Sequence, residues 1–398
     1  MRFLLVHQNF PGQFRQLTPF LAARNHELVA ICSHQRPIPQ PSTVLRYVEP
    51  KKLHDAPLGS QLWHEGLARA SSVAHLCQKL NDDGWIPDKV LGHTGWGETL
   101  GISSVWPGAK QILWPELWVQ PQHGGYGIDP LRPFPTLSSY LEQIGRNSLT
   151  RAALADASAY VLPTKHQALS FPSEFHDSRM HVIHEGIDTK IARPNKNISL
   201  TVRGIQITHE TPIVTFVNRN LERLRGFDVF MRSLPFILKS HPSVRILIVG
   251  DNDTGYGGES GDIPIKQRML LELGSHLDNE RIHFLGRIPY QHLISLLQLS
   301  WVHVYLTYPF VLGWSLLEAM SCGCPIVAST DMPVSEVIDH GVEGLLVPIN
   351  SPESIAHSVL HLLRNPQLAS DLGKRARQRA LMYDQRLTVN ALSALLET

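Results

Sequence analysis

Residues 213–240 read IVTFVNRNLERLRGFDVFMRSLPFILKS, and the pattern of this stretch changes twice. The first five residues form a short apolar and β-branched run, which is typical of a buried strand. A polar loop, 218–226, follows and ends on a glycine, after which apolar residues recur with helical spacing. The start of the chain has the same order, because FLLV at 3–6 precedes the loop HQNFPGQ and a helical segment. This succession is typical of βαβ units in a parallel sheet.

Ten further short apolar runs are predicted strands, and helical segments lie between most of them. They cover 28–31, 89–91, 111–113, 160–162, 181–183, 245–249, 282–284, 303–306, 325–328 and 344–347. Strands that alternate with helices in this way predict parallel sheets covered on both faces. The fold class expected is therefore α/β, with two doubly wound, Rossmann-like domains.

The length and the loops predict where these domains lie. A single hydrophobic core stops growing at roughly 250–300 residues, so 398 residues favour two domains. The polar, proline-containing stretch IARPNK at 191–196 marks the junction. We expect an N-terminal domain over 1–193, a C-terminal domain over 198–380, and a final helix over 381–398 that crosses back to the N-terminal domain.

Charge and cysteine content exclude several classes of protein. Lys and Arg number 36 against 35 Asp and Glu, and this neutral balance argues against a general binder of nucleic acid or anionic membrane. Four cysteines are too few for a disulfide scaffold, and their spacing matches no zinc pattern. No window approaches 18 consecutive apolar residues, so no transmembrane segment is expected. A cytoplasmic protein is the expectation, with peripheral membrane contact left open and the oligomeric state unassigned.

The loop 218–226 carries three arginines, Arg219, Arg223 and Arg225, and opens a helix. A helix N-terminus favours anions, and guanidinium groups grip phosphate oxygens in pairs. The loop therefore favours a phosphate group as ligand, although a solvated basic loop is an equal alternative from these residues alone.

A second segment with candidate chemistry is YPFVLGWSLLEAMSCGCPIVAS at 308–329, which also follows a predicted strand. Glu318 lies there in an otherwise apolar helix, and a carboxylate in such surroundings needs a partner. The sequence leaves two interpretations open: an ion pair or cap, or acceptance of hydrogen bonds from ligand hydroxyls.

Patterns for metals and other nucleotides are weak. Asp251 and Asp253 form a D-x-D pair after a strand, which can hold a divalent cation, but polar loops with two Asp are common. The GWGETLG stretch at 95–101 lacks the third glycine of a dinucleotide-binding G-x-G-x-x-G, and no P-loop motif occurs. We therefore expect no metal site.

Several blocks, in order and spacing, make the chain resemble a retaining family 4 glycosyltransferase. LLEAMSCGCPIVAS at 316–329 is similar to the family's L-E-A-M-A-C-G-x-P-V-V-A-T. RIHFLGRIPYQHLISLL at 281–297 and HVIHEGIDT at 181–189 are similar to two further family blocks. The resemblance implies the GT-B architecture, in which two Rossmann-like domains face a cleft. The N-terminal domain would then take the acceptor and the C-terminal domain the nucleotide sugar.

The resemblance also implies roles for single residues. Arg219 and Arg225 match the Arg and Lys that hold the donor pyrophosphate, with Arg in place of Lys and one extra residue between them. Glu318 matches the second Glu of the family's E-x7-E motif, which binds the ribose. Gly286 and Arg287 match the turn whose backbone meets the base.

In the first domain the resemblance is weaker. Gly12 matches a glycine that lets the backbone approach the donor. His93 lies after a predicted strand, where the family often has a His near the transferred sugar, and Glu116 is its rival. Arg219, Arg225 and His93 are thus the candidate catalytic residues, and the others are candidate substrate-binding residues.

One departure from the family concerns the donor sugar. An ungapped alignment places Phe310 where the first Glu of E-x7-E belongs, and a gapped one places Tyr308 there. That carboxylate is missing in both cases. Gly313 and neighbouring backbone N–H groups are then expected to carry more of the recognition of the sugar hydroxyls.

The resemblance implies a metal-independent enzyme without a cofactor. It would move a sugar from a nucleoside-diphosphate sugar to an acceptor hydroxyl, with retention, in polysaccharide or glycoconjugate synthesis. A UDP-sugar is the first choice of donor and a GDP-sugar the second. The alternatives are a sugar-nucleotide epimerase or phosphorylase of the same fold, or a protein that binds nucleotide sugars without chemistry.

Overall fold

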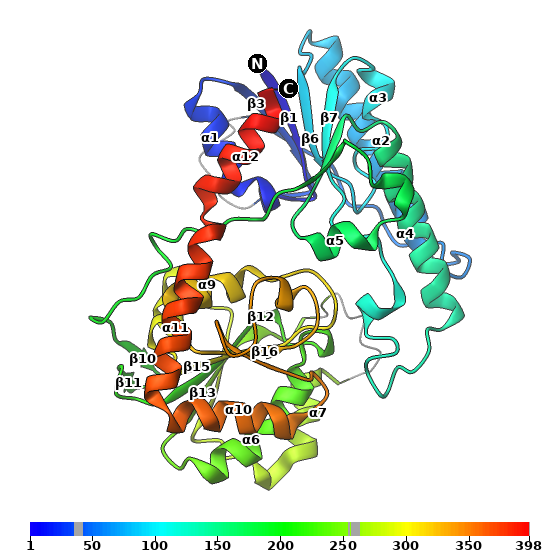
Figure 1. Ribbon diagram of the computed structural model, residues 1–398. Helices are drawn as coiled ribbons and strands as arrows, with labels where there is room; N and C mark the ends of the chain where they lie inside the picture. Colours follow the sequence, from blue (N-terminus) through cyan, green and yellow to red (C-terminus); the bar gives the residue numbers. More distant parts are fainter. Residues whose placement is uncertain (36–42, 254, 256–262, 398) are drawn as a thin grey trace. The chain divides into compact units, whose positions relative to one another are not determined.

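The computed structural model describes residues 1–35, 43–253, 255 and 263–397. The chain folds into two units (Figure 1). Unit 1 contains Met1–Pro121, Phe134–Glu185 and Thr388–Thr398, and unit 2 contains Gln122–Pro133 and Gly186–Leu387. Each unit is an α/β layer structure around a parallel sheet, which confirms the predicted fold class.

Unit 1 has a seven-stranded sheet in the order β5-β3-β1-β6-β7-β8-β9. Every neighbouring pair in it is parallel. The strands are β1 (Arg2–Val6), β3 (Glu27–Cys32), β5 (Thr43–Arg46), β6 (Lys89–His93), β7 (Lys110–Trp114), β8 (Ala159–Leu162) and β9 (Met180–Val182).

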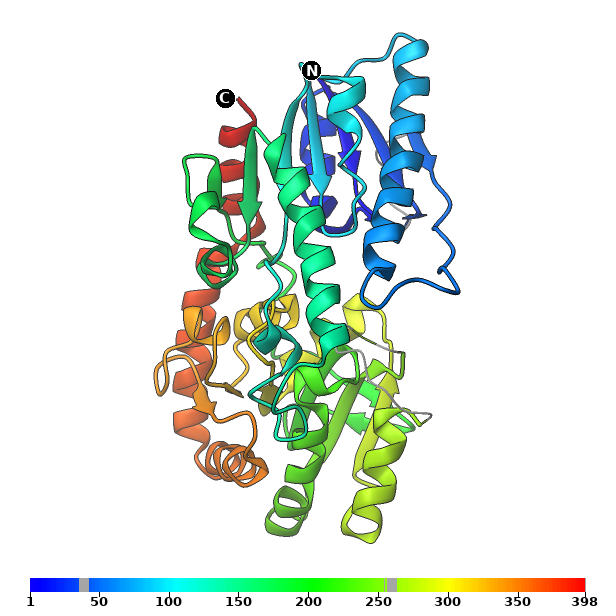
Figure 2. The ribbon, with the colours of Figure 1, turned by 90° about the vertical axis from the view of Figure 1, so that its right-hand side faces the viewer.

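Alternate residues of these strands enter different cores, as the two-residue period of a strand requires. Phe3 and Leu5 pack on one face of the sheet with helices α1 and α12, whereas Leu4 and Val6 pack on the other face with α2 and α3. Figures 1 and 2 show these two helical layers. The helices of the unit are α1 (Leu17–Ala23), α2 (Gln61–Asp82), α3 (Ile102–Val105), α4 (Leu137–Ala155) and α5 (Lys165–Ser170), and α12 (Gln385–Glu397) ends in it.

Unit 2 has a six-stranded parallel sheet in the order β14-β13-β12-β15-β16-β17. Its strands are β12 (Ile213–Asn220), β13 (Arg245–Asp251), β14 (Ile282–Gly286), β15 (Val302–Tyr305), β16 (Ile326–Ser329) and β17 (Leu345–Val347). One face packs against α6 (Phe227–Ser240), α7 (Ile265–Leu273) and α10 (Pro352–Arg364), and the other against α8 (Tyr290–Leu299) and α9 (Trp314–Cys322). Helix α11 (Pro366–Ala380) contributes to both cores.

The remaining elements are short. Two-residue strands β2 (Asn9–Phe10) and β4 (His34–Gln35) pair with each other, and so do β10 (Leu200–Val202) and β11 (Ile205–Ile207). The 3₁₀ turns are η1 (Gly12–Arg15), η2 (Pro121–Gly124), η3 (Ser173–Phe175), η4 (Arg223–Arg225), η5 (Gly274–His276), η6 (Val334–Glu336) and η7 (Leu381–Tyr383).

All twelve strands predicted from apolar runs are present. Strand β5 was not predicted, because its four residues, TVLR, lie between polar ends and carry no continuous apolar run. Strand β12 continues to Asn220, three residues beyond the predicted end, through a register shift against β13. Arg219 therefore lies in the end of this strand.

Candidate functional site

The order of the strands places one candidate site in each unit. In a doubly wound sheet, ligands bind at the carboxyl ends of the strands where the strand order reverses. In unit 1 the chain moves from β1 outward to β5 and resumes on the other side with β6, so the reversal lies between β1 and β6. In unit 2 it lies between β12 and β15. Most of the predicted site residues lie at the ends of these four strands or in the loops and helices that follow them.

Arg225 links the two loops at the reversal point of unit 2. It lies in η4, after β12, and its Nη1 donates to Thr307 Oγ1 at 2.8 Å and to the Val311 carbonyl at 2.9 Å, both after β15. Gly226, at φ 63°, follows in the left-handed region and begins α6. The guanidinium is buried, and no carboxylate of the described residues forms an ion pair with it. A buried cation bonded only to neutral groups is suited to an anionic ligand.

The other two arginines of this loop differ from Arg225. Arg219 is exposed at the end of β12, and the described part of the chain provides no ion-pair partner for it. Arg223 instead forms an ion pair with Asp129, whose Oδ1 lies 2.8 Å from its Nη2. Of the three arginines, Arg223 is thus held by a protein carboxylate.

The loop after β15 leads into helix α9. Gly313 is the N-cap of α9, and its backbone N–H donates to the Tyr305 hydroxyl at 2.7 Å. The Phe310 ring centroid lies 5.4 Å from the Arg225 guanidinium carbon, within the range of a cation–π contact. Glu318 lies in α9, five residues after its N-cap Gly313, and is only 4% exposed. Burial and the Glu318 charge raise the pKa of the Cys322 thiol.

Gly286 and Arg287 form the turn after β14. Gly286 has φ 62°, and open space surrounds the position of a side chain there, so backbone conformation is what favours glycine. Arg287 pairs with both carboxylates of the D-x-D motif, at 3.0 Å to Asp251 Oδ2 and 2.7 Å to Asp253 Oδ2. Within the described ranges, no group of three or more His, Cys, Asp or Glu side chains is placed to hold a metal ion.

In unit 1, polar side chains at or after the ends of β1, β6 and β7 form a connected network. His7 Nε2 lies 2.6 Å from Gln13 Oε1, and the Gln13 amide donates to Glu116 Oε1. His93 Nε2 lies 3.6 Å from the same Glu116 oxygen. A Cβ on Gly12 would lie 2.1 Å from His7 Nε2, and Gly12 has φ 48°, so only glycine fits beside this imidazole.

The protonation of these groups follows from their contacts. His7 Nδ1 accepts from the Asn9 backbone N–H, so the proton of the neutral ring is on Nε2 and is donated to Gln13. Burial, and then the neighbouring His93, lower the pKa of His7 to about 3. Burial, and then Arg146, lower the pKa of His93 to about 3 as well. Both imidazoles are uncharged at neutral pH.

Glu116 has an unusual backbone as well as a buried carboxyl group. Its φ of 62° is in the left-handed region, which costs a non-glycine residue free energy and often marks a functional position. Gln167 Nε2 donates to its carbonyl at 2.8 Å. Burial raises the pKa of Glu116, against the effects of Arg146 and Gln13. The buried His93 Nδ1 has no hydrogen-bond partner among the described residues, so a ligand hydroxyl could pair with it.

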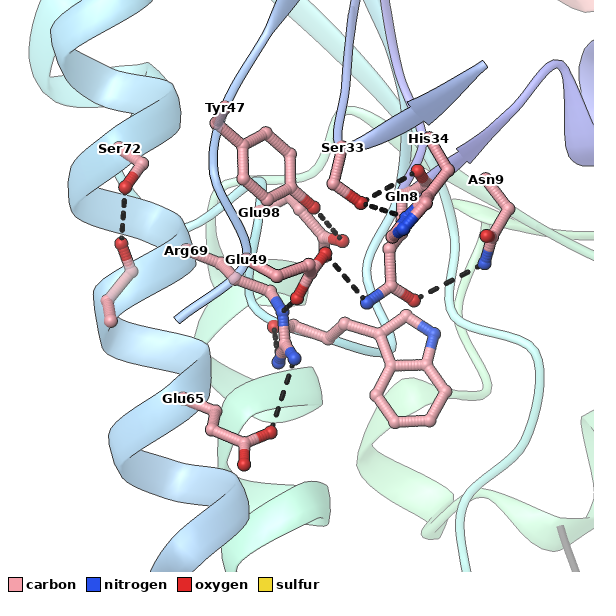
Figure 3. Close-up of polar contacts among 12 residues, drawn as sticks. Gln8, Asn9, Ser33, His34, Tyr47, Glu49, Glu65, Arg69, Ser72 and Glu98 are labelled. Atoms are coloured by element: carbon pink, nitrogen blue, oxygen red, sulfur yellow. Dashed lines mark hydrogen bonds and ion pairs between the residues drawn. The ribbon is translucent and has the colours of Figure 1, made fainter. Parts of the chain in front are cut away.

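A second polar network of unit 1 is drawn in Figure 3. Glu49 accepts from Gln8 Nε2 at 3.1 Å and from Arg69 Nε at 2.9 Å, and the Tyr47 hydroxyl donates to Glu98 Oε1 at 3.0 Å. Glu98 is fully buried, and its Oε2 has no partner among the described residues. Burial raises the pKa of Glu98 to about 7.

This raised pKa predicts a pH dependence of stability. The native state holds the Glu98 proton up to about pH 7, whereas the unfolded state releases it near the ordinary glutamate pKa of 4.5. The free energy of unfolding is therefore expected to fall as pH rises through this window, by up to about 3 kcal/mol. Urea unfolding at several pH values would measure it. Glu98→Gln should lose this slope, and an unchanged slope in that variant would contradict the assignment.

Sequence reasoning missed His7, Gln13 and Gln167 in unit 1 and Thr307 in unit 2. A signal existed for two of them, because His7 and Gln13 flank Gly12 in the first loop after a strand. Gln167 and Thr307 carried no such signal, since their partners Glu116 and Arg225 lie far away in the sequence.

Two family models match the chain. The model described as "Glycosyl transferase family 4 group" matches residues 24–192, and "Glycosyl transferases group 1" matches residues 201–379. D-inositol 3-phosphate glycosyltransferase of Corynebacterium jeikeium is 27% identical over 196 residues, which are 49% of this chain and 45% of that protein. A glycosyltransferase of Methanocaldococcus jannaschii is 31% identical over 41% of this chain and 38% of that protein. The chain thus matches about half or less of the length of these relatives.

Solved structures show the same fold. Anabaena HepE in complex with UDP and glucose has a TM-score of 0.69 and 17% identity, and the match covers 100% of both chains. Sucrose-phosphate synthase from Thermosynechococcus elongatus has a TM-score of 0.72 and 17% identity over 100% of this chain and 98% of that one. None of the described helices is both long enough and apolar enough to span a bilayer.

Proposed function

Because the chain is a family 4-like glycosyltransferase of the GT-B type, we propose that it transfers a sugar from a UDP-sugar to an acceptor hydroxyl with retention of configuration. One observation carries the donor half of this proposal. Arg225 places a buried positive charge at the reversal point of the sheet in unit 2, where the described residues offer it no carboxylate. A nucleoside diphosphate would supply the missing negative charge.

In the proposed reaction, the bond from the anomeric carbon to the pyrophosphate oxygen breaks, and a bond to the acceptor oxygen forms. Negative charge grows on the leaving pyrophosphate, where Arg225 and Arg219 would stabilise it together with the N-terminus of α6. The acceptor proton would pass to an oxygen of the leaving phosphate. His93 and Glu116 would contact the transferred sugar, with Gly12 leaving room for the approach.

The rest of the donor would bind along unit 2. Glu318 is proposed to accept hydrogen bonds from the ribose hydroxyls, and the Gly286–Arg287 turn to meet the base. Phe310 or Tyr308 takes the place of the family's sugar-binding carboxylate, and Gly313 with neighbouring backbone N–H groups would contact the sugar hydroxyls instead. The HepE structures are complexes with UDP and glucose and with UDP-glucose, which favours UDP over GDP here. A cytoplasmic role in polysaccharide or glycoconjugate synthesis completes the proposal.

A panel of UDP- and GDP-sugars, screened by thermal shift and then by turnover, tests the function. A donor at 100 times its dissociation constant should add about 2.7 kcal/mol to the free energy of unfolding. Sugar transfer to an added acceptor is the expected outcome. Binding without hydrolysis or transfer would indicate a binding protein, and a change of sugar configuration on the nucleotide would indicate an epimerase.

We expect turnover to survive chelation. Arg225 and Arg219 would supply the positive charge that a divalent cation supplies elsewhere, and Asp251 and Asp253 are already paired with Arg287. The assay compares initial rates in EDTA with those in added Mg²⁺ or Mn²⁺. Loss of turnover in EDTA, restored by either metal, would contradict this expectation and make the two aspartates candidate ligands.

A further inference from the structure

Hydrogen bonds within unit 1 run in one direction and end on the Glu116 carboxyl group. The Asn9 backbone N–H donates to His7 Nδ1 at 3.0 Å, so the ring proton lies on Nε2, which is 2.6 Å from Gln13 Oε1. The oxygen of the Gln13 amide therefore faces His7, and its nitrogen donates to Glu116 Oε1. Because this amide has a donor on one side and an acceptor on the other, its orientation is determined by its partners.

Packing holds the His7 ring in the orientation that this requires. The ring is buried, and the Phe14 ring meets it edge-on with the centroids 5.8 Å apart. A Cβ on Gly12 would lie 2.1 Å from His7 Nε2, so the backbone of turn η1 approaches the ring closely. Gln13 follows Gly12 in the same turn, and the close approach that requires glycine thus brings the Gln13 amide to the imidazole.

A second glutamine reaches Glu116 from helix α5. Gln167 Oε1 accepts from the Thr164 hydroxyl at 2.9 Å, so its amide nitrogen is the end that faces Glu116. This nitrogen donates to the Glu116 carbonyl at 2.8 Å and lies 3.4 Å from Glu116 Oε2. An amide donor thus lies beside each carboxyl oxygen, and we call Gln13 and Gln167 the amide clamp.

The clamp opposes the effect of burial on the Glu116 proton. Among the described residues, His7 after β1, His93 at the end of β6 and Arg146 in α4 are the titratable or charged groups around it, and α5 presents the neutral amide of the clamp. Burial raises the pKa of Glu116, whereas Arg146 and the Gln13 hydrogen bond lower it. An N–H donor favours the ionised form, because a carboxylate is a stronger acceptor than a carboxylic acid.

Resting on the proposed function, we propose that Gln13 is a positioning residue, which together with Gln167 holds Glu116 as an oriented carboxylate for the transferred sugar. The Glu116 side chain is 18% exposed, so a ligand can reach it. A carboxylate accepts hydrogen bonds at both oxygens, which suits sugar hydroxyls as donors. It also favours a proton on His93 Nε2, 3.6 Å away, and this leaves His93 Nδ1 as an acceptor for a further hydroxyl.

Gln13→Met tests the clamp, because it removes the amide donor and keeps the length of the side chain. NMR titration of ¹³C-labelled glutamate carboxyl groups, with the Glu116 signal identified from Glu116→Gln, measures the ionisation without any substrate. The pKa of Glu116 is expected to rise by about one to two pH units, which corresponds to one hydrogen bond to a charged group. Gln167→Met should raise this pKa less, because its nitrogen lies 3.4 Å from the carboxyl oxygen.

The pH dependence of transfer tests what the clamp does for the reaction. Since kcat/KM reports the ionisation of the free enzyme, its decrease at acid pH should move to higher pH in Gln13→Met by the same amount as the pKa of Glu116. Below both pKa values, kcat/KM should be about 10- to 100-fold lower than in the wild type. Above both, it should return to within about twofold. Damage to the fold would instead lower kcat/KM at every pH.

Gln111→Met is the matched control. Gln111 is also a buried glutamine, and it lies in β7, the strand that leads to Glu116. This variant should keep the wild-type titration of Glu116 and the wild-type pH profile.

The inference is overturned if Gln13→Met leaves the titration of Glu116 unchanged, or if Gln111→Met shifts it equally. It is also overturned if the titration moves and the pH profile of kcat/KM does not. Failure of the proposed function has a different signature, because the wild type would then transfer no sugar from any nucleotide sugar, whereas the NMR titration would still show whether the clamp sets the charge of Glu116.

Discussion

Replacing Arg225 with alanine is expected to lower kcat for sugar transfer by about 100- to 1000-fold, which equals roughly 2.7–4 kcal/mol of activation free energy. The buried guanidinium bonds only neutral groups of the described chain, so its charge is available to the leaving pyrophosphate. Charge on that group grows as the sugar departs, and an interaction that strengthens in the transition state acts on kcat. Initial rates at saturating donor and acceptor measure the effect.

Arg225 also ties two loops together, so the experiment needs a control for stability. Thr307→Val removes one hydrogen-bond acceptor of the Arg225 guanidinium but keeps the guanidinium itself. This variant should have a lower melting temperature and a kcat near wild type. Arg219→Ala should lower kcat less than Arg225→Ala, because solvent and salt screen an exposed charge. If Arg225→Ala loses only thermal stability, Arg225 is a structural tie and Arg219 becomes the better leaving-group candidate.

Replacing Glu318 with glutamine is expected to raise the donor KM by about 10- to 100-fold. This factor corresponds to the free energy of one hydrogen bond to a charged acceptor. The ribose hydroxyls do not change during transfer, so the bond contributes equally to ground state and transition state, and kcat should stay near wild type. The carboxylate is buried in α9, which is consistent with either a ligand contact or a structural one. Donor KM and melting temperature, measured together, separate the two.

Glu343→Gln provides the comparison for Glu318. Glu343 is also buried in unit 2, and it accepts from the Asp339 backbone N–H at 2.8 Å, a contact of purely structural character. We expect this variant to lose stability and to keep the wild-type donor KM. If Glu318→Gln behaves in the same way as Glu343→Gln, the ribose assignment is wrong.

The candidate residues of unit 2 rest on stronger sequence signals than those of unit 1. Arg225, Gly313 and Glu318 lie in or beside blocks whose order and spacing resemble a known family. In the structure, the Arg225 guanidinium and the Gly313 backbone N–H both donate to the Tyr305 hydroxyl. In unit 1 the sequence offered His93 and Glu116 as alternative candidates for contact with the transferred sugar. The structure brings them within 3.6 Å of each other, and adds Gln13 as the group that connects Glu116 to His7.

The amino-acid sequence by itself determined twelve of the strands, the α/β class and the loops in which the candidate residues were sought. These features depend on residues close together along the chain: runs of apolar side chains, helical spacing and glycines at turns. Only the tertiary structure decided which loop arginine is held by a protein carboxylate. Arg223 meets Asp129 across 94 residues, whereas Arg225, two residues later, donates to two hydroxyls and a carbonyl and meets no carboxylate among the described residues. No local pattern in the sequence predicts such a pair, because folding brings together side chains that lie far apart along the chain.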